Sequence, residues 1–321
     1  MGKAVLITGC ESPLARALAK YLDDLGFTVF AAFKKLQDND DAITLKETFS
    51  GRLKLLQLDV TSEVEMLEAS LYIAQHLPDG EAGLWALVHC DLWNALGELE
   101  WVPFPVLRKS FDVNVLGGYD KKGKQSASRL TQIMLPLIRN GKGRIVFLSS
   151  ALAHLPSPVR GVLCATQAAI EGFAVCLRKE LSSRQVGVSI VCASELTAGD
   201  AWLDDRDMRD QAKAMWALLS EEQKNTYGED YFEQAIRSLE PFCYGDGDFQ
   251  ATVRALSDAI VRTFPVFRYT PLTCKEKFQI IAAEYMPSLL NEAHRYEDLV
   301  IWFAEHTSPM VERDFDVSAQ R

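Results

Sequence analysis

The sequence predicts an α/β protein built on a doubly wound parallel sheet. Two features of the first 195 residues predict it: short apolar runs alternate with amphipathic segments, and the runs are apolar almost throughout. Because both faces of such a strand are apolar, helices must cover both faces of the sheet. Six runs are predicted strands, at residues 4–8, 28–33, 53–58, 84–89, 144–149 and 186–192. A sheet of this kind binds ligands beyond the carboxyl ends of its strands.

The segments between the strands carry helical periodicity. After the first strand, Leu14, Leu18, Leu22 and Leu25 recur every three or four residues. The pair Ser12-Pro13 precedes them, and a serine N-cap followed by proline at the first helical position is a good helix start.

The chain changes character from about residue 199. Residues 204–244 are rich in charged and aromatic side chains at helical spacing, and another helix is expected at 251–263. Residues 267–271 are a candidate short final strand, followed by a helical segment and a polar tail. We therefore expect residues 1–198 to form the sheet core. Residues 199–321 are expected to form a helical C-terminal extension that also supplies the last strand of the same domain.

A glycine- and lysine-rich segment interrupts what is otherwise one predicted helix over residues 114–139. Residues 117–126 contain three glycines and three lysines, a composition typical of a solvated loop. We predict that 118–126 is an exposed loop outside the catalytic cleft. The alternative is a partner or membrane-edge contact through Lys121, Lys122 and Lys124.

Composition limits the classes of function. The 321 residues are 48% hydrophobic, and 34 basic against 44 acidic residues give a net charge of −10, which disfavours nucleic acid as a partner. The sequence predicts no transmembrane segment, no signal peptide and no metal site, and its seven cysteines are expected to be reduced thiols. We expect a cytoplasmic protein, with membrane-associated or mitochondrial locations left open.

One pattern carries specific chemistry. The predicted strand 144–149 is followed by Ser150, and thirteen residues later Leu163 and Gln167 stand four apart at the start of a helix. This layout resembles the active site of the short-chain dehydrogenase/reductase family. Further matching stretches support the resemblance to the branch of D-β-hydroxybutyrate, retinol and 17β-hydroxysteroid dehydrogenases: residues 3–10, 112–117, 134–139, 170–173, 215–216, 227–228, 231–232 and 268–271.

The resemblance implies a Rossmann-type fold and a catalytic Asn, Ser, Tyr and Lys. Asn114 and Ser150 stand at matching positions, but Leu163 replaces the tyrosine and Gln167 the lysine. In the family the tyrosine moves the hydroxyl proton, and the lysine brings its pKa of about 10 toward neutrality. Losing a general acid–base group typically costs about 10²–10⁴ in rate. Asn114 and Ser150 are therefore interpreted as structural remnants.

The implied cofactor site is altered as well. Gly9 keeps the first glycine of the phosphate-binding turn, Pro13 replaces the second, and Ala15 replaces the third with another small residue. Proline removes an N–H group from the turn that approaches the pyrophosphate. Asp59 matches the residue that contacts adenine in the family. His89 begins the segment His-Cys-Asp-Leu that stands in place of the family's Asn-Asn-Ala-Gly.

Three further departures concern the two ends of the cofactor. Residues 32–35 lack the carboxylate that binds the ribose in NAD-dependent members, and Lys34 and Lys35 are either contacts for a 2′-phosphate or solvated. Leu92 occupies space beside the nicotinamide, and Ala193-Ser194 replace a Pro-Gly turn. We expect no cofactor, or weak binding of NAD(P), in a degraded site formed by Gly9, Pro13, Ala15, Asp59 and His89.

Three functions follow from these residues. The first is a catalytically impaired relative that acts as a binding or regulatory protein in lipid or steroid metabolism. The second is an NAD(P)-dependent oxidoreductase acting on the CH–OH group of a steroid, retinoid or hydroxy acid with a non-standard proton donor. Its candidate donors are His89 and Asp91, then His154 and Cys164. The third is an interaction subunit that forms homo- or hetero-oligomers with related dehydrogenases. An apolar small molecule is the expected partner, bound under the aromatic C-terminal region, although the same aromatic residues also fit an ordinary core.

Overall fold

The computed structural model describes residues 2–37, 39–48, 50–115, 127–155, 158–194, 205–239 and 249–285. Its centre is a seven-stranded sheet in the order β3-β2-β1-β4-β5-β6-β7, in which all neighbouring strands are parallel. The strands are β1 Ala4–Ile7, β2 Thr28–Phe33, β3 Leu53–Gln57, β4 Ala86–His89, β5 Arg144–Ser150, β6 Gly187–Ala193 and β7 Arg268–Tyr269. The six predicted strands, the short final strand and the parallel sheet are confirmed.

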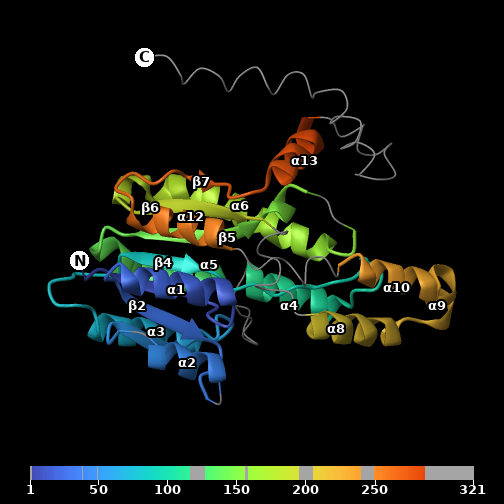
Figure 1. Cartoon of the computed structure of the whole chain (residues 1–321), viewed down its shortest axis with the longest axis horizontal. Helices are drawn as coiled ribbons and strands as arrows, with labels where there is room; N and C mark the ends of the chain where they lie inside the picture. The colour runs from blue at the N-terminus through green and yellow to red at the C-terminus, as the bar shows by residue number, and fades with distance from the viewer. Residues whose placement is uncertain are drawn as a thin grey trace. The chain divides into compact units, whose positions relative to one another are not determined.

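Helices cover both faces of this sheet (Figure 1). On one face lie α1 Pro13–Asp24, α2 Asp40–Thr48 and α12 Gln250–Val261. On the other lie α3 Glu63–Gln75, α5 Ala127–Asn140 and α6 Gly161–Leu181. The sheet is thus doubly wound, because each face buries its own layer of apolar side chains.

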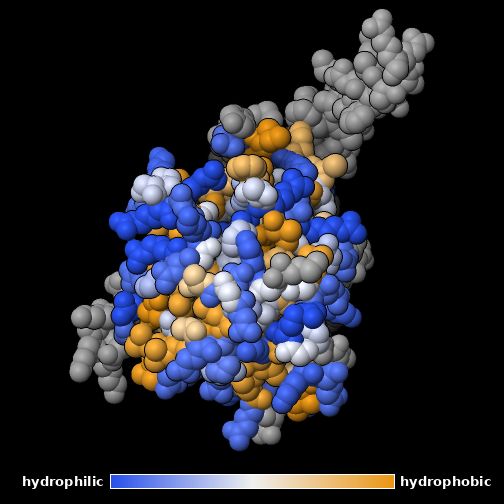
Figure 2. Space-filling model, turned by 90° about the vertical axis from the view of Figure 1, so that its left-hand side faces the viewer, coloured by the Kyte–Doolittle hydropathy of each residue, from blue (hydrophilic) through white to orange (hydrophobic). Residues whose placement is uncertain are grey.

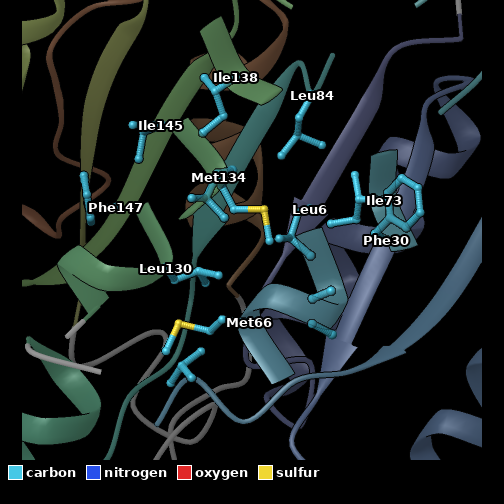
Figure 3. Close-up of a cluster of buried hydrophobic side chains, with 14 of the residues drawn as sticks. Leu6, Phe30, Met66, Ile73, Leu84, Leu130, Met134, Ile138, Ile145 and Phe147 are labelled. Carbon is cyan, nitrogen blue, oxygen red and sulfur yellow. The ribbon is translucent and has the colours of Figure 1, made fainter. Parts of the chain in front are cut away.

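The second of these layers is shown in Figure 3. Leu6 and Phe30 from β1 and β2 meet Met66 and Ile73 from α3, and Met134 from α5 completes the contact. All five side chains are almost completely buried. The apolar runs and helical stripes of the sequence meet here, as the patterning predicted.

Between β6 and α12, the described residues form three helices in the region in which the sequence predicted helical spacing. They are α8 Asp205–Leu218, α9 Glu221–Tyr227 and α10 Glu229–Arg237, and Figure 1 shows them beyond the carboxyl-end edge of the sheet, beside α4 Phe104–Asn114. The helix predicted over 114–139 is described in two parts, α4 ending at Asn114 and α5 beginning at Ala127. The predicted loop 118–126 lies outside the described residues.

The chain divides into two compact units, residues 1–273 and residues 274–321. The first contains the whole sheet and α8 to α10. In the second, the described part is the single helix α13, Cys274–Tyr285.

The surface at the amino-terminal end of the strands is mostly hydrophilic, with apolar patches between charged groups (Figure 2). Phe264, in the connection that leads into β7, is 90% exposed. Within the described chain, one helical stretch, Gly161–Arg184, is long and apolar enough to cross a membrane. Its most apolar window is 44% buried, and α6 packs against β5 and β6, so the stretch also has the properties of a core helix.

A cation–aromatic cluster joins the last part of the first unit to the sheet. Arg144, at the start of β5, is buried, and its Nη1 donates to the carbonyl oxygens of Ala259 at 3.1 Å and Arg262 at 2.8 Å. Its guanidinium lies 4.2 Å from the ring centre of Trp85, and Lys3 Nζ lies 3.0 Å from the same ring. Arg144 therefore satisfies carbonyls that the end of α12 leaves unpaired, in the position where the helix dipole favours a cation.

We expect Arg144→Ala to lower the free energy of unfolding by about 2–4 kcal/mol, because it removes two charge-assisted hydrogen bonds and a cation–π contact. Urea denaturation monitored by circular dichroism measures the change. The matched control is Arg139→Ala, an exposed arginine, which should stay within about 0.5 kcal/mol of the parent. Equal stability of both variants would contradict this role of Arg144.

Candidate active site

A cleft of about 820 Å³ opens at the carboxyl ends of β1 to β4. This is the switch point of the sheet, where β1 has β2 on one side and β4 on the other, and where open α/β sheets bind ligands. The volume falls within the range of small-molecule sites. The lining comes from the first turn, the ends of β2 to β4, α4 and α8: Gly9, Glu11, Ser12, Pro13, Lys34, Lys35, Asn39, Leu58, Asp59, Val60, Thr61, Cys90, Asp91, Leu92, Trp93, Asn94, Leu96, Lys109, Val113, Met208 and Gln211.

The turn after β1 fits tightly against the end of β4. Gly9 has φ +67°, and a Cβ there would lie 2.9 Å from the backbone of Cys90 and Asp91. Only glycine fits this contact. The helix begins at Pro13 as predicted, and Ala15 in its first turn is completely buried.

Two N–H groups of this turn are committed to carbonyl oxygens within the protein. Cys10 N donates to Ala32 O at 2.9 Å, and Ser12 N donates to Gly9 O at 3.0 Å. Pro13 has no N–H, and the Ser12 side chain makes no capping hydrogen bond, which corrects the N-cap bond expected from the sequence. Positions 10, 12 and 13 of the turn therefore offer no free N–H group to an anion.

Charges at the adenosine end of the cleft pair with one another. The Glu11 carboxylate accepts a hydrogen bond from the backbone N–H of Lys34, and Lys34 Nζ lies 3.2 Å from Asp59 Oδ2. Asp59 Oδ1 also accepts from Thr61 N at 2.8 Å and Thr61 Oγ1 at 2.6 Å. Burial raises the pKa of Asp59, but the Thr61 hydrogen bonds and the Lys34 cation outweigh it, so that the pKa is lowered. Asp59 is therefore an ionised, internally satisfied group.

Asp91 differs from these carboxylates. It lines the cleft and also a cavity of about 20 Å³, a volume suited to a single water molecule. Its Oδ2 is buried and has no hydrogen-bond partner among the described residues. The pKa of Asp91 is raised to about 7; burial is the main cause, Glu11 and Asp59 also contribute, and a hydrogen bond with Thr8 opposes the shift.

The positions that correspond to the family's catalytic residues lie outside the lining of this cleft. Ser150, Leu163 and Gln167 are 2%, 2% and 1% exposed, and none of them is among the cleft's lining residues. Ser150 Oγ accepts from Leu152 N at 3.0 Å and so caps a short 3₁₀ turn. Gln167 Nε2 is buried without a hydrogen-bond partner in the described part of the chain.

Asn114 acts as a connector between three segments. Its Oδ1 accepts from Trp93 N at 2.7 Å, and its Nδ2 donates to Trp93 O at 2.9 Å and to Thr166 Oγ1 at 3.1 Å. These bonds join the end of α4 to the β4–α4 loop and to α6. The hydrogen-bonding capacity of this amide is largely used in holding the backbone.

The candidate proton donors do not gather in one place. His89 Nε2 lies 2.9 Å from Thr131 Oγ1 on α5, its ring stacks on Phe147, and it lines the small cavity rather than the cleft. Burial lowers the pKa of His89 to about 4, so the ring is neutral at pH 7. Cys164 Sγ is directed to Leu155 O at 3.6 Å. Of the four candidates, Asp91 is the one that lines the cleft.

His154 belongs to a separate ionic cluster around Glu171. Glu171 accepts from Ser149 Oγ at 2.8 Å, lies 2.9 Å from His154 Nε2 and pairs with Arg268. Burial raises the pKa of Glu171, but hydrogen bonds from His154, Arg268 and Ser149 outweigh it and the pKa is lowered. The cluster joins β5, α6 and β7, and sequence reasoning did not find it because its members are far apart in the chain.

The aromatic residues of the C-terminal region pack around Trp101. The Trp101 ring lies 5.6 Å from Trp216, 5.3 Å from Tyr227, 6.1 Å from Tyr231 and 5.6 Å from Phe232. Trp101 is 2% exposed, so these rings form a core between the β4–α4 loop and α8 to α10. Gln211 on α8 fastens the same loop, accepting from Leu96 N and donating to Asn94 O. The sequence indicated the aromatic stripe, but it did not indicate Trp101 or Gln211 as its partners.

The parallel sheet and the cleft at its switch point define a Rossmann-type α/β protein. Comparisons with known proteins identify its family. Residues 3–202 match the model of the short chain dehydrogenase family. The chain is 34% identical to D-beta-hydroxybutyrate dehydrogenase, mitochondrial, of Rattus norvegicus over 84% of this chain and 77% of that protein. It is 30% identical to retinol dehydrogenase 7 of Rattus norvegicus, over 92% and 88% of the two chains. A short-chain dehydrogenase structure from Streptomyces avermitilis superposes with a TM-score of 0.68 at 19% identity, covering 94% of this chain and 99% of that one.

This chain belongs to the short-chain dehydrogenase family, whose members typically bind NAD(P). The cleft has room for the adenosine side of such a cofactor. The residues at the other end do not fit a nicotinamide ribose, because Gln167 is uncharged and buried away from the cleft, and Leu92 lines the space. The commitment of the Cys10 and Ser12 N–H groups weakens the fit to the pyrophosphate in between.

The raised pKa of Asp91 predicts a pH-dependent stability. An unfolded aspartate has a pKa near 4, so the contribution of neutral Asp91 is fully present below that value and is lost as pH rises through about 7. Asp91→Asn keeps the shape and removes the charge. We expect it to raise the free energy of unfolding at pH 8 by about 1–3 kcal/mol, with the gain shrinking toward pH 4. Thermal melts between pH 4 and 8 measure this, with the exposed Asp79→Asn as control, and a gain independent of pH would contradict the assignment.

Proposed function

We propose that this protein is a divergent short-chain dehydrogenase relative that has lost hydride-transfer chemistry and acts as a binding or regulatory protein in lipid or steroid metabolism. The observation that carries the proposal is the burial of Leu163 and Gln167 at the positions of the catalytic Tyr and Lys. Neither side chain donates a proton to a substrate. Neither residue is among those that line the cleft.

The retained residues support the same proposal. Asn114 and Ser150 have their hydrogen bonds within the protein, to Trp93, Thr166 and Leu152. Each bond stabilises a backbone segment, which is a sufficient reason for the residue type. The class of ligand is supported by the relatives, which are named for hydroxybutyrate, retinol and hydroxysteroids. An apolar small molecule of this kind is the expected ligand, and the cytoplasmic location stays a prediction.

The alternative is an NAD(P)-dependent oxidoreductase that uses a non-standard proton donor on a steroid, retinoid or hydroxy-acid substrate. One observation favours it: Asp91 lines the cleft and has a pKa of about 7, the range in which a general acid–base group works best. Turnover of any such substrate that is abolished by Asp91→Asn would support the alternative against our proposal.

We expect NAD⁺, NADH, NADP⁺ and NADPH to bind with dissociation constants in the millimolar range or not to bind at all (1 mM corresponds to about −4 kcal/mol). Pro13, Leu92 and Gln167 each remove a contact or the space for one. Isothermal titration calorimetry with all four cofactors is the measurement. A low-micromolar constant for any of them would disprove the expectation.

Restoring the two catalytic residues should not restore the enzyme. We expect Leu163→Tyr with Gln167→Lys to give no turnover comparable with an ordinary family member, because both positions are buried and the cofactor turn stays altered. Adding Pro13→Gly and Leu92→Gly should strengthen NAD(H) binding. Spectrophotometric assays of NADH formation compare the double and quadruple variants, and full activity in the double variant would show that the cofactor site is intact.

A further inference from the structure

The cleft has a volume of about 820 Å³, but several of the residues that line it do not suit a dinucleotide. Among the described residues, three carboxylates line it, and two of these have hydrogen-bond or ionic partners within the protein. Glu11 accepts a hydrogen bond from the backbone N–H of Lys34. Asp59 forms an ion pair with the Lys34 ammonium and accepts two hydrogen bonds from Thr61. Asp91 is the third, and its Oδ2 has no partner among the described residues. Thr8 hydrogen-bonds the carboxyl of Asp91, so above about pH 7 an ionised carboxylate with one unpaired oxygen lies in the wall of an open cleft.

The place of Asp91 decides which part of a ligand meets this charge. Its backbone N lies 2.9 Å from where a Cβ of Gly9 would stand, so Asp91 adjoins the turn that faces a diphosphate in dinucleotide-binding folds. A phosphate at that turn and an ionised Asp91 repel each other, and partial burial strengthens the repulsion relative to water. A ligand with hydroxyl or amino donors at the same place is instead attracted.

The lysines of the cleft do not cancel this charge. Lys34 is paired with Asp59 at 3.2 Å. Lys109 extends from α4, and its Nζ lies 4.1 Å from the ring centre of Trp93, where the cation has an aromatic partner. Burial, and then Lys34, lower the pKa of Lys109. Lys35 is exposed to solvent at the rim.

We propose that the cleft takes a nucleoside-sized, phosphate-free ligand that presents hydrogen-bond donors, and that the charge of Asp91 sets this preference. The inference rests on the proposed function, because it treats the cleft as a binding site and not as the cofactor site of an active dehydrogenase. Asp91 stands where the family carries a small alanine, so the family's own cofactor meets no such charge.

Adenosine and ADP form the matched pair of probes, since they differ only in the diphosphate. At pH 8 we expect the parent protein to bind adenosine at least about ten times more tightly than ADP, a difference of about 1.4 kcal/mol. Asp91→Asn should weaken adenosine, strengthen ADP and reduce the ratio of the two constants by about tenfold. Asp91→Ala, which restores the family residue, should strengthen ADP in the same way. Calorimetric titration gives the constants, and Asp79→Asn should leave them unchanged.

The preference should also depend on pH. The groups that face Asp91 are the Thr8 hydroxyl from β1, Glu11 from the first turn, Asp59 after β3, and the thiols of Cys10 and Cys90. Burial raises the pKa of both thiols well above neutrality, so they stay uncharged. In the parent protein the preference for adenosine should narrow as pH falls from 8 to 6. In Asp91→Asn the preference for adenosine over ADP should change with pH only because the phosphates of ADP titrate. That contribution is the same for the parent protein and the variant.

The proposal would be overturned if the ratio of the ADP and adenosine dissociation constants in Asp91→Asn lay within twofold of the ratio in the parent. The absence of adenosine binding to the parent protein would also overturn it. A melting temperature at least equal to that of the parent shows that the variant is folded. Both measurements, of binding constants and of melting temperatures, are independent of any enzymatic activity. The discovery of dehydrogenase activity would instead overturn the proposed function, so the two failures are distinguishable.

Discussion

The close contact between the first turn and the end of β4 is the constraint on which the cleft depends. Gly9 allows the two backbones to meet, and Thr8 reinforces the contact by accepting a hydrogen bond from Cys90 N at 3.2 Å. Because the backbones cannot separate, the side chain of Asp91 is held beside the turn. One change of residue type at this point therefore alters the electrostatics of the whole site without altering the fold.

The main side-chain contacts that hold the sheet do not involve the positions of the family's catalytic residues. The sheet is held by two apolar layers, by Arg144 at the end of α12 and by the Glu171 cluster between β5, α6 and β7. None of these needs a catalytic residue. The burial of Leu163 follows the same logic, since an apolar side chain stabilises a buried helix face better than an ionisable one.

Local sequence patterns predicted most of the fold. Strands with apolar residues on both faces, helices with repeated leucines and the Ser12-Pro13 helix start each depend on neighbours within a few residues. The bounds of β2 were predicted without error, and those of β5 and β6 to within one residue at either end. The Ser12 side chain was the exception: it stands at the N-cap position but makes no capping hydrogen bond.

The sequence by itself determined the parallel sheet and the family, because these follow from patterns and spacing along the chain. Only the tertiary structure decided which side chains share the cleft. It directed His89 to Thr131 on α5 and left Asp91 in the cleft wall, although both residues line the small cavity. It also paired Lys34 with Asp59 and enclosed Trp101 in the aromatic residues of α8 to α10. The pairing of charges and the burial of side chains depend on residues that are far apart in the sequence. Local sequence patterns do not show which of these residues come together.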